Sequence, residues 1–285
     1  MAIEEKTRLA TMQLATGPRM QYAERGDPMG DAIVFLHGYS DSWFSFSRVL
    51  PLLSPEYRAF AITQRGHGDS EKPECCYTPA DFASDVDAFM AAVGIESANI
   101  VGASTGALFA QRLALDYPRR VDRLVLIGPQ TPANEDINEL VEEVRALEDP
   151  VPPEFVRGFQ ESTVHRPVPQ EFLDTVVSES LKLPARVWRD YLEQAVFSID
   201  YDYVRELREI EAPTLILWGE QDPLFPREEQ ERLAAAIPDA TLKVYPDTGH
   251  AVHWDRPEWV VRDLEEFVKG TRPPGVGATE AEGRD

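Results

Sequence analysis

The stretch Gly102-Ala-Ser-Thr-Gly106 constrains the fold of this chain more than any other. The apolar residues Ile100 and Val101 precede it, and residues 107–115 follow with the apolar spacing of an amphipathic helix. A strand, an abrupt turn with Ser104 at its apex and a helix form the context in which Gly-x-Ser-x-Gly acts as a nucleophile elbow. So tight a turn brings the positions two before and two after the serine almost into contact, where a Cβ would clash. The stretch therefore predicts an exposed serine on a strained turn.

The pattern by itself is weak, because chance supplies it in a chain of this length with a probability on the order of one in ten. A serine nucleophile needs an adjacent base, and the base needs a carboxylate to hold its tautomer. Two other predicted strands end at suitable side chains, with Asp222 after residues 214–218 and His250 after residues 241–245. Because chemistry collects at the carboxyl ends of parallel strands, we expect these groups to meet.

The order of apolar patterns along the chain predicts a parallel α/β sheet. Strands are predicted at residues 7–16, 19–25, 31–36, 57–63, 98–102, 121–127, 214–218 and 241–245. Between them, helices are predicted at residues 43–53, 79–93, 107–116, 227–236 and 257–269. Strands that alternate with helices through short loops are the signature of this fold class, with helices on both faces of the sheet.

The alternation stops between residues 130 and 205. Residues 135–148, 153–161, 169–182 and 184–198 each show helical spacing, with prolines between them and no strand pattern. We therefore predict a core of residues 1–129 and 206–270, an all-helical cap inserted at 130–205, and a disordered tail at 271–285, which is rich in Gly, Pro and Glu.

Composition narrows the function classes. The 285 residues are 43% hydrophobic, with a formal net charge of −22 spread along the chain. Such a charge disfavours nucleic acids and anionic membranes as partners and is typical of a solvated surface. No apolar run approaches the roughly 20 residues needed to span a bilayer. The first residues lack a secretion signal, and Cys75 and Cys76 are expected to be reduced, so we predict a cytoplasmic protein. We expect no metal site and no cofactor, because the five histidines and two cysteines do not cluster and no nucleotide-binding glycine motif follows a strand.

Several motifs in the same order resemble those of the α/β-hydrolase superfamily. They are His37-Gly38, Arg65-Gly-His-Gly-Asp-Ser70, Gly102-Ala-Ser-Thr-Gly106, Trp218-Gly-Glu-Gln-Asp222, and Gly249-His250 with Asp255-Arg-Pro257. The resemblance covers about residues 20 to 269, and the chain order Ser, Asp, His is the one that this superfamily uses.

The resemblance implies a role for each matched residue. Ser104 would be the nucleophile, His250 the base and Asp222 the acid, with Glu220 left open as a rival acid. The backbone N–H groups of Tyr39 and Thr105 would form the oxyanion hole.

Departures from the pattern separate the activities found on this fold. Epoxide hydrolases and haloalkane dehalogenases carry an aspartate where Ser104 stands, and many of the former have proline at the position of Ser40. Carbon–carbon hydrolases tend to have tryptophan where Ala251 follows the histidine. We therefore predict hydrolysis of a carboxylic ester or lactone of a small, fairly apolar molecule. Carbon–carbon cleavage, perhydrolysis and a low-turnover ligand receptor remain alternatives, and the sequence does not bear on the oligomeric state.

The other candidate residues receive simpler predictions. Ser40 and Trp188 are predicted substrate contacts. His37 and His67 are predicted to be hydrogen-bonded scaffold residues in their glycine-flanked loops. His253 is expected at the surface where a helix begins, with the entrance of the site as the alternative because it is close to the base. Asp255 is expected as the N-cap of the last helix, and His165 facing solvent.

Overall fold

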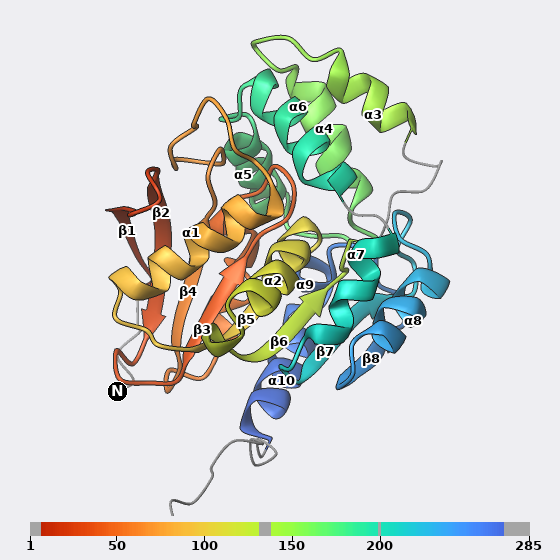
Figure 1. Ribbon diagram of the computed structural model, residues 1–285. Coiled ribbons are helices and arrows are strands. Elements are labelled where there is room, and N and C mark those ends of the chain that lie inside the picture. The colour runs from red at the N-terminus through yellow and green to blue at the C-terminus, as the bar shows by residue number, and fades with distance from the viewer. Residues whose placement is uncertain (1–6, 131–137, 199–200, 271–285) are drawn as a thin grey trace, which may run out of the picture.

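The computed structural model describes residues 7–130, 138–198 and 201–270. Their strands form one sheet of eight in the order β1-β2-β4-β3-β5-β6-β7-β8 (Figure 1). The strands are β1 (Arg8–Gln13), β2 (Arg19–Gly26), β3 (Ala32–Leu36), β4 (Arg58–Thr63), β5 (Ala98–Ala103), β6 (Val121–Ile127), β7 (Thr214–Gly219) and β8 (Ala240–Tyr245). β1 with β2 and β2 with β4 pair antiparallel, and all other neighbours pair parallel. The predicted mostly parallel α/β sheet is confirmed.

Helices cover both faces of the sheet. They are α1 (Pro79–Ala92), α2 (Thr105–Asp116), α3 (Asn138–Arg145), α4 (Pro153–Ser162), α5 (Gln170–Ser180), α6 (Ala185–Gln194), α7 (Tyr201–Glu206), α8 (Arg227–Ala236), α9 (Val252–Asp255) and α10 (Pro257–Lys269), with 3₁₀ turns η1 (Trp43–Phe46), η2 (Leu50–Leu52), η3 (Pro118–Arg120), η5 (Val196–Ser198) and η6 (Leu207–Glu209). In Figure 1, α1, α2, α7 and α8 lie in front of the sheet and α9 and α10 behind it. Two apolar cores result, one on each face, because the strands bury side chains in both directions.

The start of α1, at the first residue of the predicted helix 79–93, is fixed by its cap. Pro79 is its first residue, and the side chain of Thr78 accepts a hydrogen bond from the backbone N–H of Asp81. The carboxylate of Asp81 accepts in return from the backbone N–H of Thr78, which completes a capping box.

The helix predicted at residues 43–53 is wrong. The segment forms the short turns η1 and η2 instead. Pro51 lies inside the predicted span and has no N–H to donate to a preceding carbonyl, so a continuous α-helix is disfavoured there.

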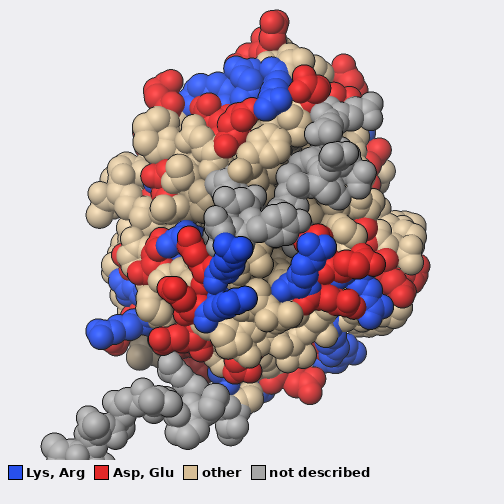
Figure 2. All heavy atoms as spheres, turned by 45° about the vertical axis from the view of Figure 1, so that its right-hand side comes forward, with Lys and Arg blue, Asp and Glu red and all other residues tan. Residues whose placement is uncertain are grey.

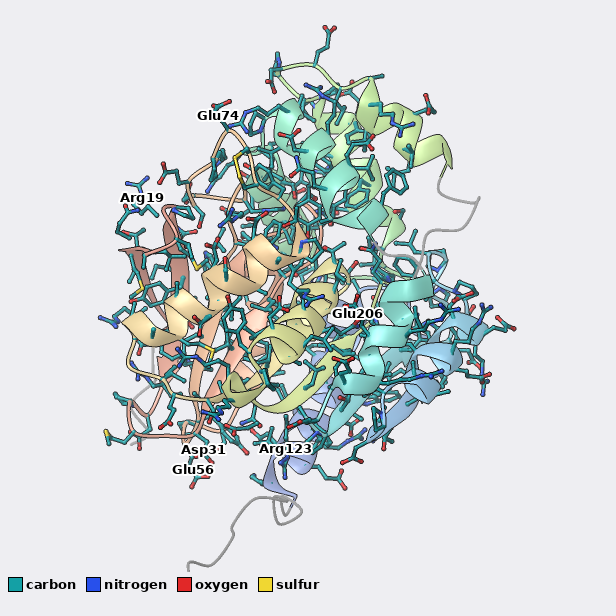
Figure 3. All side chains as sticks on the ribbon, in the orientation of Figure 1. Arg19, Asp31, Glu56, Glu74, Arg123 and Glu206 are labelled. Carbon is teal, nitrogen blue, oxygen red and sulfur yellow. A yellow bond between two sulfur atoms is a disulfide. The ribbon has the colours of Figure 1, made fainter. Side chains whose placement is uncertain are left out.

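A helical insertion separates β6 from β7. Helices α3 to α6 lie together above the sheet in Figure 1, close to their predicted positions. Helix α7, which the sequence pattern did not indicate, packs beside α8 on the sheet instead. Its Glu206, labelled in Figure 3, accepts from Nη1 of Arg112 on α2 at 2.9 Å. The last residues of the predicted insertion therefore pack with the helices of the core.

The loop after β4 reaches the insertion and contains a disulfide. Cys75 and Cys76 are joined, so the prediction of reduced thiols is wrong. The chain bends at Glu74 and Cys75, and Cys76 takes a left-handed conformation with φ of 78°, which brings the adjacent sulfur atoms together. Glu74, labelled at the top of this loop in Figure 3, lies 3.4 Å from Nη2 of Arg186 on α6.

The surface carries both signs of charge. Acidic and basic side chains are interspersed on the face in Figure 2, although the net charge is −22. Within the described part of the chain, no helix combines the length and apolar character that crossing a bilayer requires.

Candidate active site

Ser104 stands between the last residue of β5 and the first residue of α2. Its backbone has φ of 52° and ψ of −121°, a conformation that non-glycine residues rarely adopt. A Cβ at Gly102 would lie 2.4 Å from the carbonyl oxygen of Gly106, as the elbow predicted. Glycine is required at residue 106 for a further reason: a Cβ there would lie 2.3 Å from the carbonyl oxygen of Leu36 at the end of β3. The turn is thus locked by two close backbone approaches.

Asp222 and His250 meet across the loops that follow β7 and β8. Oδ2 of Asp222 lies 2.9 Å from Nδ1 of His250, and both side chains are buried, at 0% and 5% exposure. The backbone N–H groups of Leu224 and Phe225 donate to Oδ1 of Asp222 at 2.8 and 3.1 Å, which fixes the carboxylate. Glu220 is exposed, so of the two candidate acids Asp222 is the one at the histidine.

Ser104 and His250 line the same cavity under the insertion. The cavity lining consists of Gly38, Tyr39, Asp41, Ala103, Ser104, Ile127, Phe159, Gln160, Thr163, Leu224, His250, Ala251, His253 and Trp254. Gly128, with φ of 50°, lies against the imidazole: a Cβ there would lie 3.2 Å from Nδ1 of His250. A side chain at residue 128 would therefore displace the histidine.

Tyr39 and Thr105 lie where backbone donors to the cavity are expected. Tyr39 lines the cavity, and Thr105 is the first residue of α2, so its N–H has no acceptor within the helix. Both side chains bond to α6. The Tyr39 hydroxyl donates to the carbonyl oxygen of Trp188 at 2.5 Å, and Oγ1 of Thr105 lies 2.5 Å from the hydroxyl of Tyr191. The rings of Tyr39 and Tyr191 also stack, with centroids 4.8 Å apart.

A family model described as alpha/beta hydrolase fold matches residues 31–257. The chain belongs to this family. It is 30% identical over 272 residues to the 2-hydroxy-6-oxononadienedioate/2-hydroxy-6-oxononatrienedioate hydrolase of Burkholderia vietnamiensis, with 88% of this chain and 91% of that protein covered.

Solved structures of other α/β hydrolases superpose well. An esterase from Exiguobacterium antarcticum gives a TM-score of 0.79 at 22% identity, covering 92% of this chain and 99% of that one. The enol-lactonase from Burkholderia xenovorans gives 0.78 at 19% identity, covering 92% of this chain and all (100%) of that one. At these identities the two structures show the shared fold alone.

The two predicted substrate contacts of this α/β hydrolase are not in the cavity lining. Ser40 is fully buried, and its hydroxyl accepts from Nε2 of Gln160 at 3.0 Å. The Trp188 ring is fully buried between those of Tyr39 and Phe155. Neither side chain lines the cavity in this structure, and their role as substrate contacts stays a prediction.

His253 and Asp255 also differ from prediction. His253 is buried at 4% exposure and lines the cavity, because α9 turns inward before α10 begins. Asp255 does not cap α10, whose N-cap is Arg256. Its Oδ2 accepts from the backbone N–H groups of Gly249 at 2.7 Å and His165 at 3.2 Å, which ties the loop before His250 to the loop after α4.

The other histidine predictions agree with the structure. Burial lowers the pKa of His37 to about 4 and that of His67 well below its ordinary value, so both are neutral. Nε2 of His37 accepts from the backbone N–H of Gln64 at 3.0 Å, while Nδ1 of His67 lies 2.8 Å from the carbonyl oxygen of Arg65. His165 is 42% exposed at its side chain, as expected.

Sequence reasoning missed Asp41 and Gln160, which lie on the cavity wall 119 residues apart. A carboxylate between a tyrosine-containing loop and a 3₁₀ turn carries no recognisable signal, and Gln160 reads as an ordinary polar residue of an amphipathic helix. Only the packing of α4 over the loop after β3 brings the two side chains together.

Proposed function

We propose that this α/β hydrolase is a serine hydrolase that cleaves a neutral carboxylic ester or lactone. The observation that carries the proposal is the buried 2.9 Å contact between Asp222 and His250 beside a cavity that His250 shares with the strained Ser104. A serine, a histidine and a carboxylate so arranged on three strand ends form a nucleophile with its base and orienting acid.

The proposed reaction has two halves. Oγ of Ser104 attacks the carbonyl carbon while His250 takes the hydroxyl proton, and Asp222 stabilises the imidazolium that forms. The N–H groups of Tyr39 and Thr105 stabilise the oxyanion, each by about 3 kcal/mol. His250 then protonates the departing alcohol, and a water molecule that His250 deprotonates releases the acid from Ser104. A lactone would give a single hydroxy acid.

The cavity lining supports a neutral substrate. Among its described residues there is no Lys or Arg, whereas Asp41 contributes a carboxylate. The internal segments outside the described residues, 131–137 and 199–200, contain no Lys or Arg in sequence either. A substrate carboxylate placed in this cavity would therefore meet repulsion without a cationic partner.

Carbon–carbon hydrolysis is the second candidate, because the relative from Burkholderia vietnamiensis bears the name of a dienedioate hydrolase. The lining argues against a substrate with two carboxylates, and Ala251 stands where such enzymes tend to have tryptophan. Product analysis separates the two candidate reactions. Acid and alcohol in equal amounts indicate ester cleavage, whereas an acid formed from a substrate ketone, with a second fragment that is released at carbon, indicates carbon–carbon cleavage. A peracid formed with hydrogen peroxide would indicate perhydrolysis.

Cytoplasmic location stays a prediction.

Labelling with a fluorophosphonate probe tests the proposal. We expect an adduct on the peptide that contains Ser104 in the wild type and none in Ser104→Ala, since only an activated serine attacks the probe. Both proteins should show the same circular dichroism, which excludes misfolding of the variant. An unlabelled, folded wild type would overturn the proposal and favour a ligand receptor on this fold.

A further inference from the structure

One carboxyl group on the wall of the catalytic cavity has no part in the proposed reaction. Asp41 lines the cavity and is 7% exposed. Asp41 and the nucleophile lie on the same side of Gly38: a Cβ on Gly38 would be 3.1 Å from Cβ of Ser104 and 3.6 Å from Oδ2 of Asp41. Oδ2 of Asp41 is therefore close to the position where a substrate carbonyl would meet Ser104.

Two buried donors fix this carboxylate. Nε2 of Gln160 donates to Oδ1 of Asp41 at 3.0 Å, and the hydroxyl of Ser45 donates to Oδ2 at 3.0 Å. Ser45 in turn accepts from Nε1 of Trp254 at 3.0 Å, and its Oγ lies 2.9 Å from Nε2 of His253. The backbone N–H of Gly38 also interacts with this carboxylate. Because a carboxylate has about four lone-pair positions, these three donors leave acceptor capacity on Asp41.

The charged and titratable groups around Asp41 do not neutralise it. His250 faces it across the cavity, with the carboxylate of Asp222 behind, and neutral His253 lies beyond Ser45. Arg48, which is close enough to His253 to lower its pKa, donates to the carbonyl oxygen of Trp254 and does not line the cavity.

Two further observations agree with an acceptor on Asp41 that is free for a substrate. Tyr191 on α6 interacts electrostatically with Asp41 but is buried and uncharged, so it does not neutralise the carboxylate. Burial raises the pKa of Asp41 to about 6, against the hydrogen bonds from Ser45 and Gln160 that lower it. A buried carboxyl that keeps acceptor capacity and opens to a substrate cavity is a candidate functional group.

We propose that Asp41 is a specificity-determining residue whose Oδ2 accepts a hydrogen bond from a hydroxyl or N–H group that the substrate carries near its reacting carbonyl. The preferred substrates are therefore neutral esters or lactones with such a donor, and their counterparts without it are poorer. This inference rests on the proposed function, because the donor is placed relative to a carbonyl at Ser104.

Two matched pairs of esters test the inference in a pH-stat assay near pH 8. One pair, methyl 3-hydroxybutanoate and methyl butanoate, places the hydroxyl on the acyl side. The other, 2-hydroxyethyl butanoate and propyl butanoate, places it on the alcohol side. In the wild type we expect kcat/KM to favour the hydroxylated member of at least one pair by about tenfold or more, the effect of a hydrogen bond to a charged group.

Asp41→Asn should reduce this preference to about threefold or less. The amide oxygen must stay at Gln160, since an NH₂ group there would face another donor, so Nδ2 replaces Oδ2. The substrate hydroxyl then loses its charged acceptor and can only accept a neutral hydrogen bond from Nδ2. The ratio within a pair cancels any general loss of activity. Glu220→Gln, which removes an exposed carboxylate outside the cavity lining, is the matched control and should keep the wild-type ratio.

The outcomes distinguish the two proposals. Hydrolysis of both pairs without preference, or a preference of the same size in Asp41→Asn as in the wild type, overturns the role of Asp41 and leaves the serine hydrolase intact. A wild type that labels at Ser104 but hydrolyses neither pair also counts against it. A wild type that neither labels nor hydrolyses overturns the proposed function, and the inference with it.

Discussion

The choice between two neighbouring acids is made at the level of single residues. Asp222 contacts His250, while Glu220 lies exposed on the same loop. We expect Asp222→Asn to lower kcat on an active ester by about 10³- to 10⁴-fold, because the amide no longer holds the productive tautomer of the imidazole. Fluorophosphonate labelling of Ser104 should slow in parallel.

Glu220→Gln is the natural comparison, since it removes a carboxylate two residues away. Its kcat should stay within about twofold of the wild type, because surface carboxylates contribute little to a buried site. Equal losses in both variants would mean that net charge near the site, and not the contact with His250, supports the activity.

At this scale the sequence predicted residues on strand ends and missed residues whose burial depends on how later elements pack. Ser104, Asp222 and His250 follow apolar strands, so their positions in the sheet can be inferred from the pattern alone. His253 and Asp255 follow His250 within five residues, yet their burial depends on an inward turn of α9 that no periodicity announces. Asp41 depends on Gln160, which is distant in sequence.

At the scale of elements, α6 forms hydrogen bonds with the side chains of Tyr39 and Thr105. These are the two residues whose backbone N–H groups are proposed to bind the oxyanion. Tyr191→Phe removes the hydroxyl bonded to Oγ1 of Thr105 and keeps the ring that stacks on Tyr39. We expect kcat to fall by roughly three- to tenfold with KM little changed, because the loss affects alignment of a donor used in the transition state.

Tyr245→Phe is a matched control for that experiment. It also removes a buried hydroxyl, which donates to Oδ2 of Asp263 at 2.5 Å and does not line the cavity. Both variants should lose similar thermal stability, but only Tyr191→Phe should lose kcat. If Tyr191→Phe raised only KM, or if both variants had the same kcat, Tyr191 would serve packing only.

Element bounds were predictable where capping and proline signals coincide with periodicity. Helices α8 and α10 begin and end where the sequence predicts, and α1 ends one residue early. Segment 43–53 shows why apolar spacing alone is not enough, because Pro51 interrupts the backbone pattern that the spacing suggests. The adjacent cysteines show the reverse case, in which local backbone conformation overrides a general expectation.

For the whole molecule, buried neutral histidines make folding sensitive to acid. The pKa values of His37 and His253 are lowered by burial to about 4 and about 3, and that of His67 lies well below 6.5. Below pH 6.5 the unfolded chain binds protons at these residues that the folded protein does not, so stability falls as pH falls. Asp41 acts in the opposite sense between its ordinary pKa of 3.8 and about 6, because the folded state holds its proton.

Three histidines against one carboxyl leave a net difference of two protons between about pH 6 and pH 4. We therefore expect the free energy of unfolding to fall by about 3 kcal/mol per pH unit in this range. Urea unfolding in about 1 M salt measures it, since salt screens the repulsion within a chain of net charge −22.

Replacing one buried histidine sharpens this measurement. His37→Gln should reduce the pH slope by about 1.4 kcal/mol per unit. A slope that is the same in the wild type and the variant would show that carboxylates, and not the buried histidines, govern acid unfolding.

The attachment of α6 also bears on how a substrate reaches Ser104. If this helix swung away from the sheet, Tyr39 and Thr105 would lose their partners on it, and the oxyanion site would be dismantled each time the enzyme opened. Phe159 and Leu224 line both the catalytic cavity and an outer apolar groove between α3 and α4. A substrate that entered beside these two side chains would leave α6 and the catalytic donors in place.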